Sequence, residues 1–143
     1  MRYFDTGVLL KLYLPEPRAA EAVAHVNASA SIPPITPLHE LEMRSAMRQK
    51  AGRGEITLVE CAALIAEMDA DLSSGVHESA TVVWADVFAR AESLSAGHGV
   101  NTLCRSLDTL HVALALELGA AEFCTFDHRQ SLMAAAAGLT VIS

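Results

Sequence analysis

Residues 1–13 read MRYFDTGVLLKLY, an apolar run that meets an acidic residue before a second apolar segment. The run predicts a short buried strand over residues 1–5, and the segment after it predicts a helix over residues 6–13 that stops near Pro15. Asp5 lies where the strand ends and the helix begins. Sites in open α/β sheets form at the carboxyl ends of strands, so Asp5 is a candidate site residue. A helix N-cap is the competing interpretation, because Asp caps helices well.

The same arrangement returns near the other end of the chain. A strand predicted over residues 122–126 runs into Asp127, and a helix is predicted over residues 129–137. Parallel strands bring their carboxyl ends to one edge of a sheet, so we expect Asp5 and Asp127 to share a site there.

Helices and strands alternate between these two ends. Helices are predicted over residues 17–26, 37–50, 56–72, 86–95 and 107–118, and strands over residues 31–35, 81–84 and 139–142. The glycines that follow residue 95, at positions 97 and 99, are expected to end the helix before them. This order predicts an α/β fold whose parallel sheet is covered by helices on both faces.

The composition predicts one domain over residues 1–143. Hydrophobic residues make up 52% of the chain but aromatic residues only 5%, so the core must consist of Ala, Leu, Val and Ile. No apolar run reaches the roughly 18 residues of a membrane span. A charged residue within the first five positions argues against a secretory signal. The widely spaced Cys61, Cys104 and Cys124 form no CxxC motif, which favours reduced thiols in a cytoplasmic protein.

The formal net charge is −7, whereas proteins that bind nucleic acid tightly through its phosphates are usually basic. This balance argues against tight non-specific binding, but a nuclease whose acids hold a metal ion is compatible with it. Four of the ten basic residues fall within ten positions: Arg44, Arg48, Lys50 and Arg53. Arg44 and Arg48 are candidate phosphate contacts, and a solvated helix face is the alternative interpretation.

The helix over residues 37–50 presents one carboxylate inward and one outward. On a helical wheel, Glu42 borders the apolar stripe. Glu40 lies on the other side, one turn before Arg44, and that acid-to-base order suits an exposed pair. We therefore predict Glu42 as the site residue and Glu40 as a surface residue. A helix-flank acid that reaches water is the alternative for Glu42.

Asp108 opens the most apolar helix of the chain, with Val112 and Ala115 on its face. A partly desolvated carboxylate is costly unless it is paired or bound to a metal ion, so Asp108 is a candidate ligand. N-capping of the helix is the competing interpretation. His111 is one turn further on and could assist in metal or acid–base chemistry, although a lone helical histidine is more often simply packed.

Four acidic residues therefore compose the candidate site: Asp5, Glu42, Asp108 and Asp127. Hard oxygen ligands suit Mg²⁺ or Mn²⁺, and the six histidines show no HxxxH or HExxH spacing of a zinc site. A metal ion held by carboxylates lowers the pKa of bound water and stabilises charge on a phosphate. The pattern predicts phosphodiester hydrolysis with all four acids catalytic and with Asp5, Asp108 and Asp127 as metal ligands. The number of ions, one or two, stays open.

Four segments of the chain resemble the PIN-domain ribonucleases of the VapC toxin type. The segments are residues 3–17, YFDTGVLLKLYLPEP, residues 41–47, LEMRSAM, residues 107–115, LDTLHVALA, and residues 125–130, TFDHRQ. Each segment alone would be a weak signal. Together they follow the family's order over the whole chain, and this makes the resemblance specific.

The resemblance implies a three-layer α/β/α sandwich with a central parallel sheet. It implies a Mg²⁺- or Mn²⁺-dependent endoribonuclease that hydrolyses RNA. The four candidate acids match the family's acidic positions, and Thr125 matches its small hydroxyl position near the last acid. Thr6, beside Asp5, is a second candidate supporting hydroxyl. Gly7 departs from the pattern, because serine is common at that position.

The resemblance also implies partners. Toxins of this family are usually homodimers, and a cognate antitoxin holds them inactive by placing its tail over the acidic groove. A stand-alone PIN nuclease of RNA processing and a catalytically silent PIN-fold binding module are the alternatives that remain open.

Two other enzyme classes share parts of the opening segment. Residues 4–7, FDTG, are also the signature of aspartic proteases, in which two aspartates share a proton. That class needs a β-rich fold and, at this length, a dimer, and the helical pattern of the chain argues against it. A haloacid-type phosphatase would need a second aspartate at position 7, where Gly7 stands.

Overall fold

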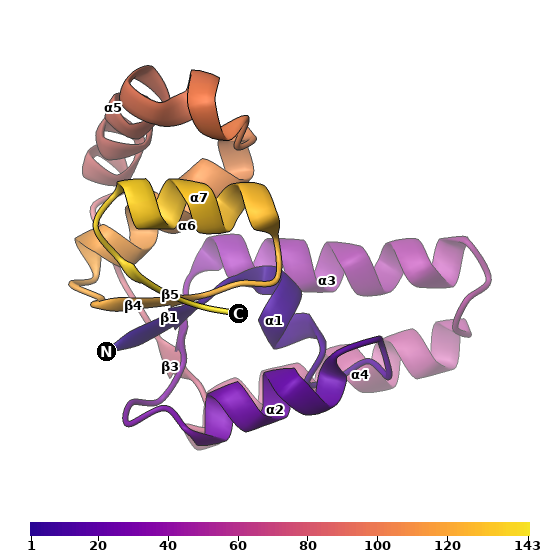
Figure 1. Ribbon diagram of the computed structural model, residues 1–143. Coiled ribbons are helices and arrows are strands. Elements are labelled where there is room, and N and C mark those ends of the chain that lie inside the picture. The colour runs from indigo at the N-terminus through magenta and orange to yellow at the C-terminus, as the bar shows by residue number, and fades with distance from the viewer.

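Three short parallel strands form the centre of the computed structural model, which describes residues 1–143 (Figure 1). β1 (Arg2–Phe4) pairs with β4 (Glu122–Cys124), and β4 pairs with β5 (Thr140–Ile142). All three strands run in the same direction, so Asp5 and the residues after Cys124 lie at one edge of the sheet.

Helices cover both faces of this sheet (Figure 1). Successive strand residues point to opposite faces, and Tyr3 and Phe123 therefore enter one apolar cluster while Phe4 and Cys124 enter another. The first cluster is completed by α5 (Trp84–Thr102), α6 (Ser106–Glu117) and α7 (His128–Ala136). The second is completed by α1 (Thr6–Leu10), α2 (Ala19–Asn27), α3 (Pro37–Gly52) and α4 (Leu58–Ser74). The predicted three-layer α/β/α architecture is confirmed.

The sequence accounts for where the long helices of the second layer begin. Thr36 and His39 form a capping box at the start of α3, and Pro37 occupies the first helical position, where its missing N–H has no cost. Thr57 and Glu60 form the capping box of α4. α1 is shorter than predicted, because residues 11–13 form turns rather than a continued helix.

The strand predicted over residues 81–84 is wrong. β2 (Pro34–Ile35) pairs instead with β3 (Glu78–Ser79), and Trp84 begins α5. Val82 and Trp84 pack against the core formed with α5, α6 and α7. The bulky side chains that suggested a strand are therefore used for packing rather than for pairing.

The predicted end of the helix over residues 86–95 is also wrong, because α5 continues through Gly97 and Gly99 to Thr102. Glycine costs about 1 kcal/mol relative to alanine inside a helix, and packing of α5 against α6 and α7 overcomes that cost. Leu103, in the left-handed region at φ 53°, then ends the helix. No helix combines the length and the apolar character that crossing a membrane would need.

Candidate active site

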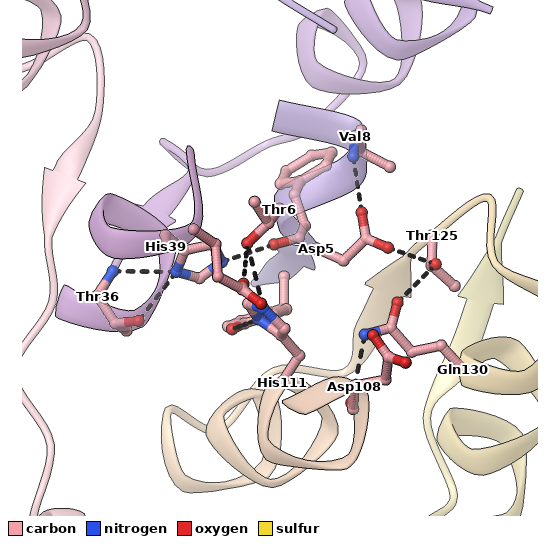
Figure 2. A network of polar contacts seen from close by, with 12 residues as sticks. Asp5, Thr6, Val8, Thr36, His39, Asp108, His111, Thr125 and Gln130 are labelled. Atoms are coloured by element: carbon pink, nitrogen blue, oxygen red, sulfur yellow. Dashed lines mark hydrogen bonds and ion pairs between the residues drawn. The ribbon is translucent and has the colours of Figure 1, made fainter. Parts of the chain in front are cut away.

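Asp5 occupies a buried position directly after β1, and 6% of the residue is exposed. Its Oδ1 accepts a hydrogen bond from the Val8 amide at 2.7 Å, which caps α1, and its Oδ2 accepts from the Thr125 hydroxyl at 2.6 Å (Figure 2). Burial raises the pKa of Asp5, the bonds from Thr125 and Val8 oppose this, and the charge of Asp108 adds to the rise. Asp5 is therefore the N-cap of α1 and also a candidate site residue.

Thr125 is the junction between Asp5 and Gln130. Its single hydroxyl proton faces two acceptors, Asp5 Oδ2 at 2.6 Å and Gln130 Oε1 at 2.7 Å. The hydroxyl can donate to only one of these two oxygens at a time. The Gln130 side chain continues to the backbone oxygen of Asp108 at 3.3 Å and so ties α7 to α6 (Figure 2).

Asp127 lies at the same edge of the sheet, two residues after Thr125. Its Oδ1 accepts from the Gln130 amide at 2.8 Å and caps α7, and its own amide donates to Thr125 Oγ1 at 3.0 Å. Asp127 is exposed, and Oδ2 makes no hydrogen bond to the protein. Like Asp5, Asp127 caps a helix, but unlike Asp5 it keeps one carboxylate oxygen without a hydrogen bond to the protein.

Glu42 projects from α3 into a second network at the same edge. Its Oε2 accepts from the Thr6 hydroxyl at 2.6 Å and from His111 Nε2 at 2.5 Å, and His111 Nδ1 lies 2.7 Å from the Tyr3 hydroxyl. Burial alone would raise the pKa of Glu42, but the bonds from His111 and Thr6 outweigh burial and lower it. The predicted surface pair is confirmed, since Arg44 bonds Glu40 at 2.7 Å.

His39 fixes the backbone that leads into Asp5. The Thr36 amide donates to His39 Nδ1 at 3.1 Å, so the ring proton is on Nε2, which donates to the Phe4 carbonyl at 3.0 Å. Burial lowers the pKa of His39 well below its usual value. The neutral ring therefore holds the last residue of β1 against α3.

Asp108 lies in the first turn of α6 and is not its N-cap, a position held by Arg105. Arg105 Nε approaches Asp108 Oδ2 at 3.4 Å. Burial raises the pKa of Asp108, the charge of Arg105 opposes this and the charge of Asp127 adds to the rise. The charge of Asp127 therefore raises the pKa of Asp108, and the charge of Asp108 raises the pKa of Asp5.

Two hollows are lined by candidate acids. One, of about 310 Å³, is lined by Glu42 and Asp108 together with Arg105. The other, of about 180 Å³, is lined by Thr125 and Asp127. Glu42 and Asp108 therefore share one hollow and Asp127 lines the other, and no three His, Cys, Asp or Glu side chains are close enough to form a ready metal site.

The donor chemistry fits a hard divalent cation. Glu42, Asp108 and Asp127 each keep one carboxylate oxygen without a hydrogen bond to the protein. Oxygen donors of this kind suit Mg²⁺ or Mn²⁺. The pKa values of Asp5 and Asp108 are raised because both groups are desolvated beside another carboxylate, and a cation would relieve that cost.

The predicted phosphate contacts lie outside these networks. Arg44 is engaged by Glu40 and, at 2.6 Å, by Asp69 of α4, and Arg48 follows one turn later on an exposed part of α3. The structure instead puts Arg105 beside Asp108, a neighbour that sequence reasoning did not find.

Sequence reasoning also missed His39 and Gln130. Both stand three residues after the cap of their helix, Thr36 for α3 and Asp127 for α7. A polar residue at that spacing is the signature of a capping box, and this signal could have identified them.

Comparisons with known proteins agree on the fold. A family model described as PIN domain matches residues 2–136. A chain in the crystal structure of FitAcB from Neisseria gonorrhoeae matches with a TM-score of 0.72 and 17% sequence identity, over 100% of this chain and 97% of that chain. At this identity the likeness shows the fold alone. No curated protein matches the sequence.

Proposed function

The chain belongs to the PIN domain family, whose members are generally nucleases and commonly depend on metal ions, and from this premise we propose that it is a Mg²⁺- or Mn²⁺-dependent endoribonuclease. One observation carries the proposal. Asp5 and Asp108 are desolvated carboxylates, the charge of Asp108 raises the pKa of Asp5, and the charge of Asp127 raises that of Asp108. Glu42 and Asp127 each keep one carboxylate oxygen that binds no protein group. A bound cation would offset the cost of charging these carboxylates.

In this proposal Asp5, Asp108 and Asp127 hold the ion. When bound, a divalent ion lowers the pKa of a water molecule and stabilises negative charge on the phosphate. Glu42 Oε1, which makes no hydrogen bond to the protein, orients the attacking water and takes up its proton. Thr6 and His111 fix the other oxygen of Glu42, and Thr125 fixes Asp5 Oδ2. These contacts hold the carboxylates in place before RNA arrives.

Arg105 contacts Asp108, with Nε 3.4 Å from Oδ2. It lines the same hollow as Glu42 and Asp108, and most of its side chain is exposed. We propose that its guanidinium would move from Asp108 to the RNA backbone once a bound ion neutralised the Asp108 carboxylate. Arg44 and Arg48 stay candidate phosphate contacts, as predicted from the sequence.

The test is cleavage of a fluorescently labelled single-stranded RNA with Mg²⁺, with Mn²⁺ and with a chelator. We expect cleavage that requires the metal ion and is lost in Asp108→Asn. Asp86→Asn, an exposed aspartate in the first turn of α5, serves as the matched control and should retain full activity. Metal-independent cleavage, or none by the wild type, would exclude this function and leave a silent PIN-fold binding module.

We further propose that the nuclease is the toxin of a type II toxin–antitoxin pair, acting as a homodimer. The sequence resembles VapC toxins, and the free carboxylate oxygens and net charge of −7 would attract a basic antitoxin tail. Leu58 and Val59 on α4 are 80% and 79% exposed and offer apolar surface for a partner.

Co-expression with the neighbouring gene tests this second step. A product that binds the chain and suppresses RNA cleavage supports the toxin assignment, and binding should weaken with salt. A neighbour that neither binds nor inhibits would favour a stand-alone nuclease of RNA processing.

A further inference from the structure

Arg18 lies beside the acidic edge, which is the edge of the sheet where Asp5 and Asp127 follow β1 and β4. It takes no part in the hydrogen-bond networks described above. Its guanidinium carbon lies 3.8 Å from the centroid of the Phe126 ring, and Phe126 is the residue between Thr125 and Asp127. Arg18 also lines the hollow of about 180 Å³ that Thr125 and Asp127 share. A positive charge is therefore held at the Asp127 end of the site.

The backbone at Arg18 is held in an unusual conformation. Its φ is 66°, in the left-handed region that residues with a side chain rarely occupy. Such conformations persist where the surrounding structure fixes them, and they gather at functional sites. Arg18 has this conformation at the N-cap of α2, and its side chain lies over the Phe126 ring.

The guanidinium still has donors to offer. Nε and Nη2 donate to Glu21, one turn into α2, with the shortest contact at 2.8 Å. Nη1 makes no hydrogen bond to the protein, and the hollow that Arg18 lines contains His128 and Ser131 as further polar groups. A planar donor with one free edge, stacked on an aromatic ring, is well suited to a phosphate group.

We propose that Arg18 and this hollow bind a phosphate of the RNA strand next to the phosphate that is cleaved. The inference rests on the proposed nuclease function. It also explains how a chain with a net charge of −7 holds RNA, since a single cation at the end of the acidic group attracts the strand locally. Glu21 weakens the attraction of Arg18 for a phosphate, because its carboxylate pairs with the same guanidinium.

The experiment compares Arg18→Gln, Arg18→Lys and Glu21→Gln with a matched pair elsewhere, Arg53→Gln and Glu55→Gln. Arg53 and Glu55 form the same kind of exposed ion pair, after the far end of α3. Their distance from Glu42 along the helix is about 16 Å. Steady-state kcat and KM for RNA cleavage are measured over a range of salt concentrations, and binding of the same RNA is measured in chelator by fluorescence anisotropy.

Arg18→Gln should raise KM about ten-fold with kcat within two-fold, the loss of one charge-assisted contact. The salt dependence of binding should become shallower by about 0.7 in the log–log slope, the value for one phosphate on a single strand. Arg18→Lys should recover part of the affinity. Glu21→Gln should lower KM, whereas Arg53→Gln and Glu55→Gln should leave KM unchanged.

The outcomes separate this inference from the function on which it rests. If the wild type cleaves RNA but Arg18→Gln and Arg53→Gln have the same KM and salt slope, the subsite is refuted and the nuclease function stands. If the wild type does not cleave RNA but binds it through Arg18, the nuclease function fails and the subsite stands. If Arg18→Gln does not fold, Arg18→Lys and Glu21→Gln decide the question, and no change in either refutes the subsite.

Discussion

His111 Nε2 lies 2.5 Å from Glu42 Oε2, and this contact joins α6 to α3 at the edge of the sheet. The other ring nitrogen, Nδ1, lies 2.7 Å from the hydroxyl of Tyr3, a fully buried residue of β1. Burial raises the pKa of Tyr3 well above its usual value, and the charges of Asp5 and Glu42 add to this, so its hydroxyl stays a donor. A Tyr3 hydroxyl that donates to Nδ1 leaves the Nε2 proton for Glu42. A core tyrosine thus orients a site carboxylate through one histidine.

We predict that Tyr3→Phe lowers the free energy of unfolding by about 1–3 kcal/mol, because it leaves His111 Nδ1 buried without a partner. The imidazole is then free to change tautomer, and Glu42 loses its fixed donor. The kcat for RNA cleavage should therefore fall as well. Chemical denaturation gives the stability, and ¹⁵N spectra of the histidine ring report the tautomer.

Tyr13→Phe is the control for this prediction. The Tyr13 hydroxyl bonds Asp71 and His77, away from the acidic edge, so its removal should change stability and leave kcat unaltered. Equal kcat values for Tyr3→Phe and wild type would show that Tyr3 does not position Glu42.

Glu42→Gln should reduce kcat about 100-fold or more, the usual effect of losing a residue that transfers a proton. Glu40→Gln should change kcat less than about two-fold, because an exposed ion pair on a helix contributes only about 0.3–0.5 kcal/mol. Both residues lie on α3, but their side chains point in different directions, because Glu42 contacts His111 and Glu40 contacts Arg44. Similar losses in both variants would contradict the assignment of Glu42.

Asp108→Asn should stabilise the metal-free protein near pH 7 while removing activity. Burial raises the pKa of Asp108 above 3.8, the value for an unperturbed aspartate. The folded state therefore holds this proton more tightly than the unfolded state. The group's contribution to stability is full below about pH 3.8 and is lost as the pH rises through the folded pKa.

Thermal denaturation in the presence of a chelator tests whether Asp108→Asn stabilises the metal-free protein. The melting temperature of Asp108→Asn should exceed that of the wild type near pH 7, and the difference should shrink as the pH falls toward about 4. Mg²⁺ should raise the melting temperature of the wild type and have less effect on the variant. A variant that is less stable at neutral pH and equally stabilised by Mg²⁺ would remove Asp108 from the metal site.

Gly7 offers a test of the one departure from the family pattern. A Cβ at this position would lie 3.5 Å from Asp5 Oδ1, which is ordinary contact. Gly7→Ala should therefore raise the free energy of unfolding by up to about 1 kcal/mol, the helix propensity difference. Gly7→Ser should also donate a hydrogen bond to Asp5 and lower its pKa, which Gly7→Ala cannot do.

Titration of the Asp5 carboxyl by NMR in chelator distinguishes the two variants. A lower pKa in Gly7→Ser than in Gly7→Ala is the expected result. An unchanged pKa in both would mean that the added hydroxyl points away from Asp5.

Much of the fold follows from local pattern alone. The apolar runs before Asp5 and Asp127 are strands, and the capped apolar segments are helices, because strand burial and helix capping are encoded within a few residues. The errors fall where long-range packing opposes local preference. α5 continues through Gly97 and Gly99, and Val82 and Trp84 fill a core instead of pairing as a strand.

The sequence by itself determined the local placement of the candidate acids, since strand ends and helical phase fix the direction of Asp5, Asp127 and Glu42 within their own elements. Only the tertiary structure decided what holds them. Two of the partners come from far along the sequence: His111 is 69 positions from Glu42, and Thr125 is 120 positions from Asp5. Contacts of that kind leave no local periodicity, because they depend on which elements the sheet brings side by side.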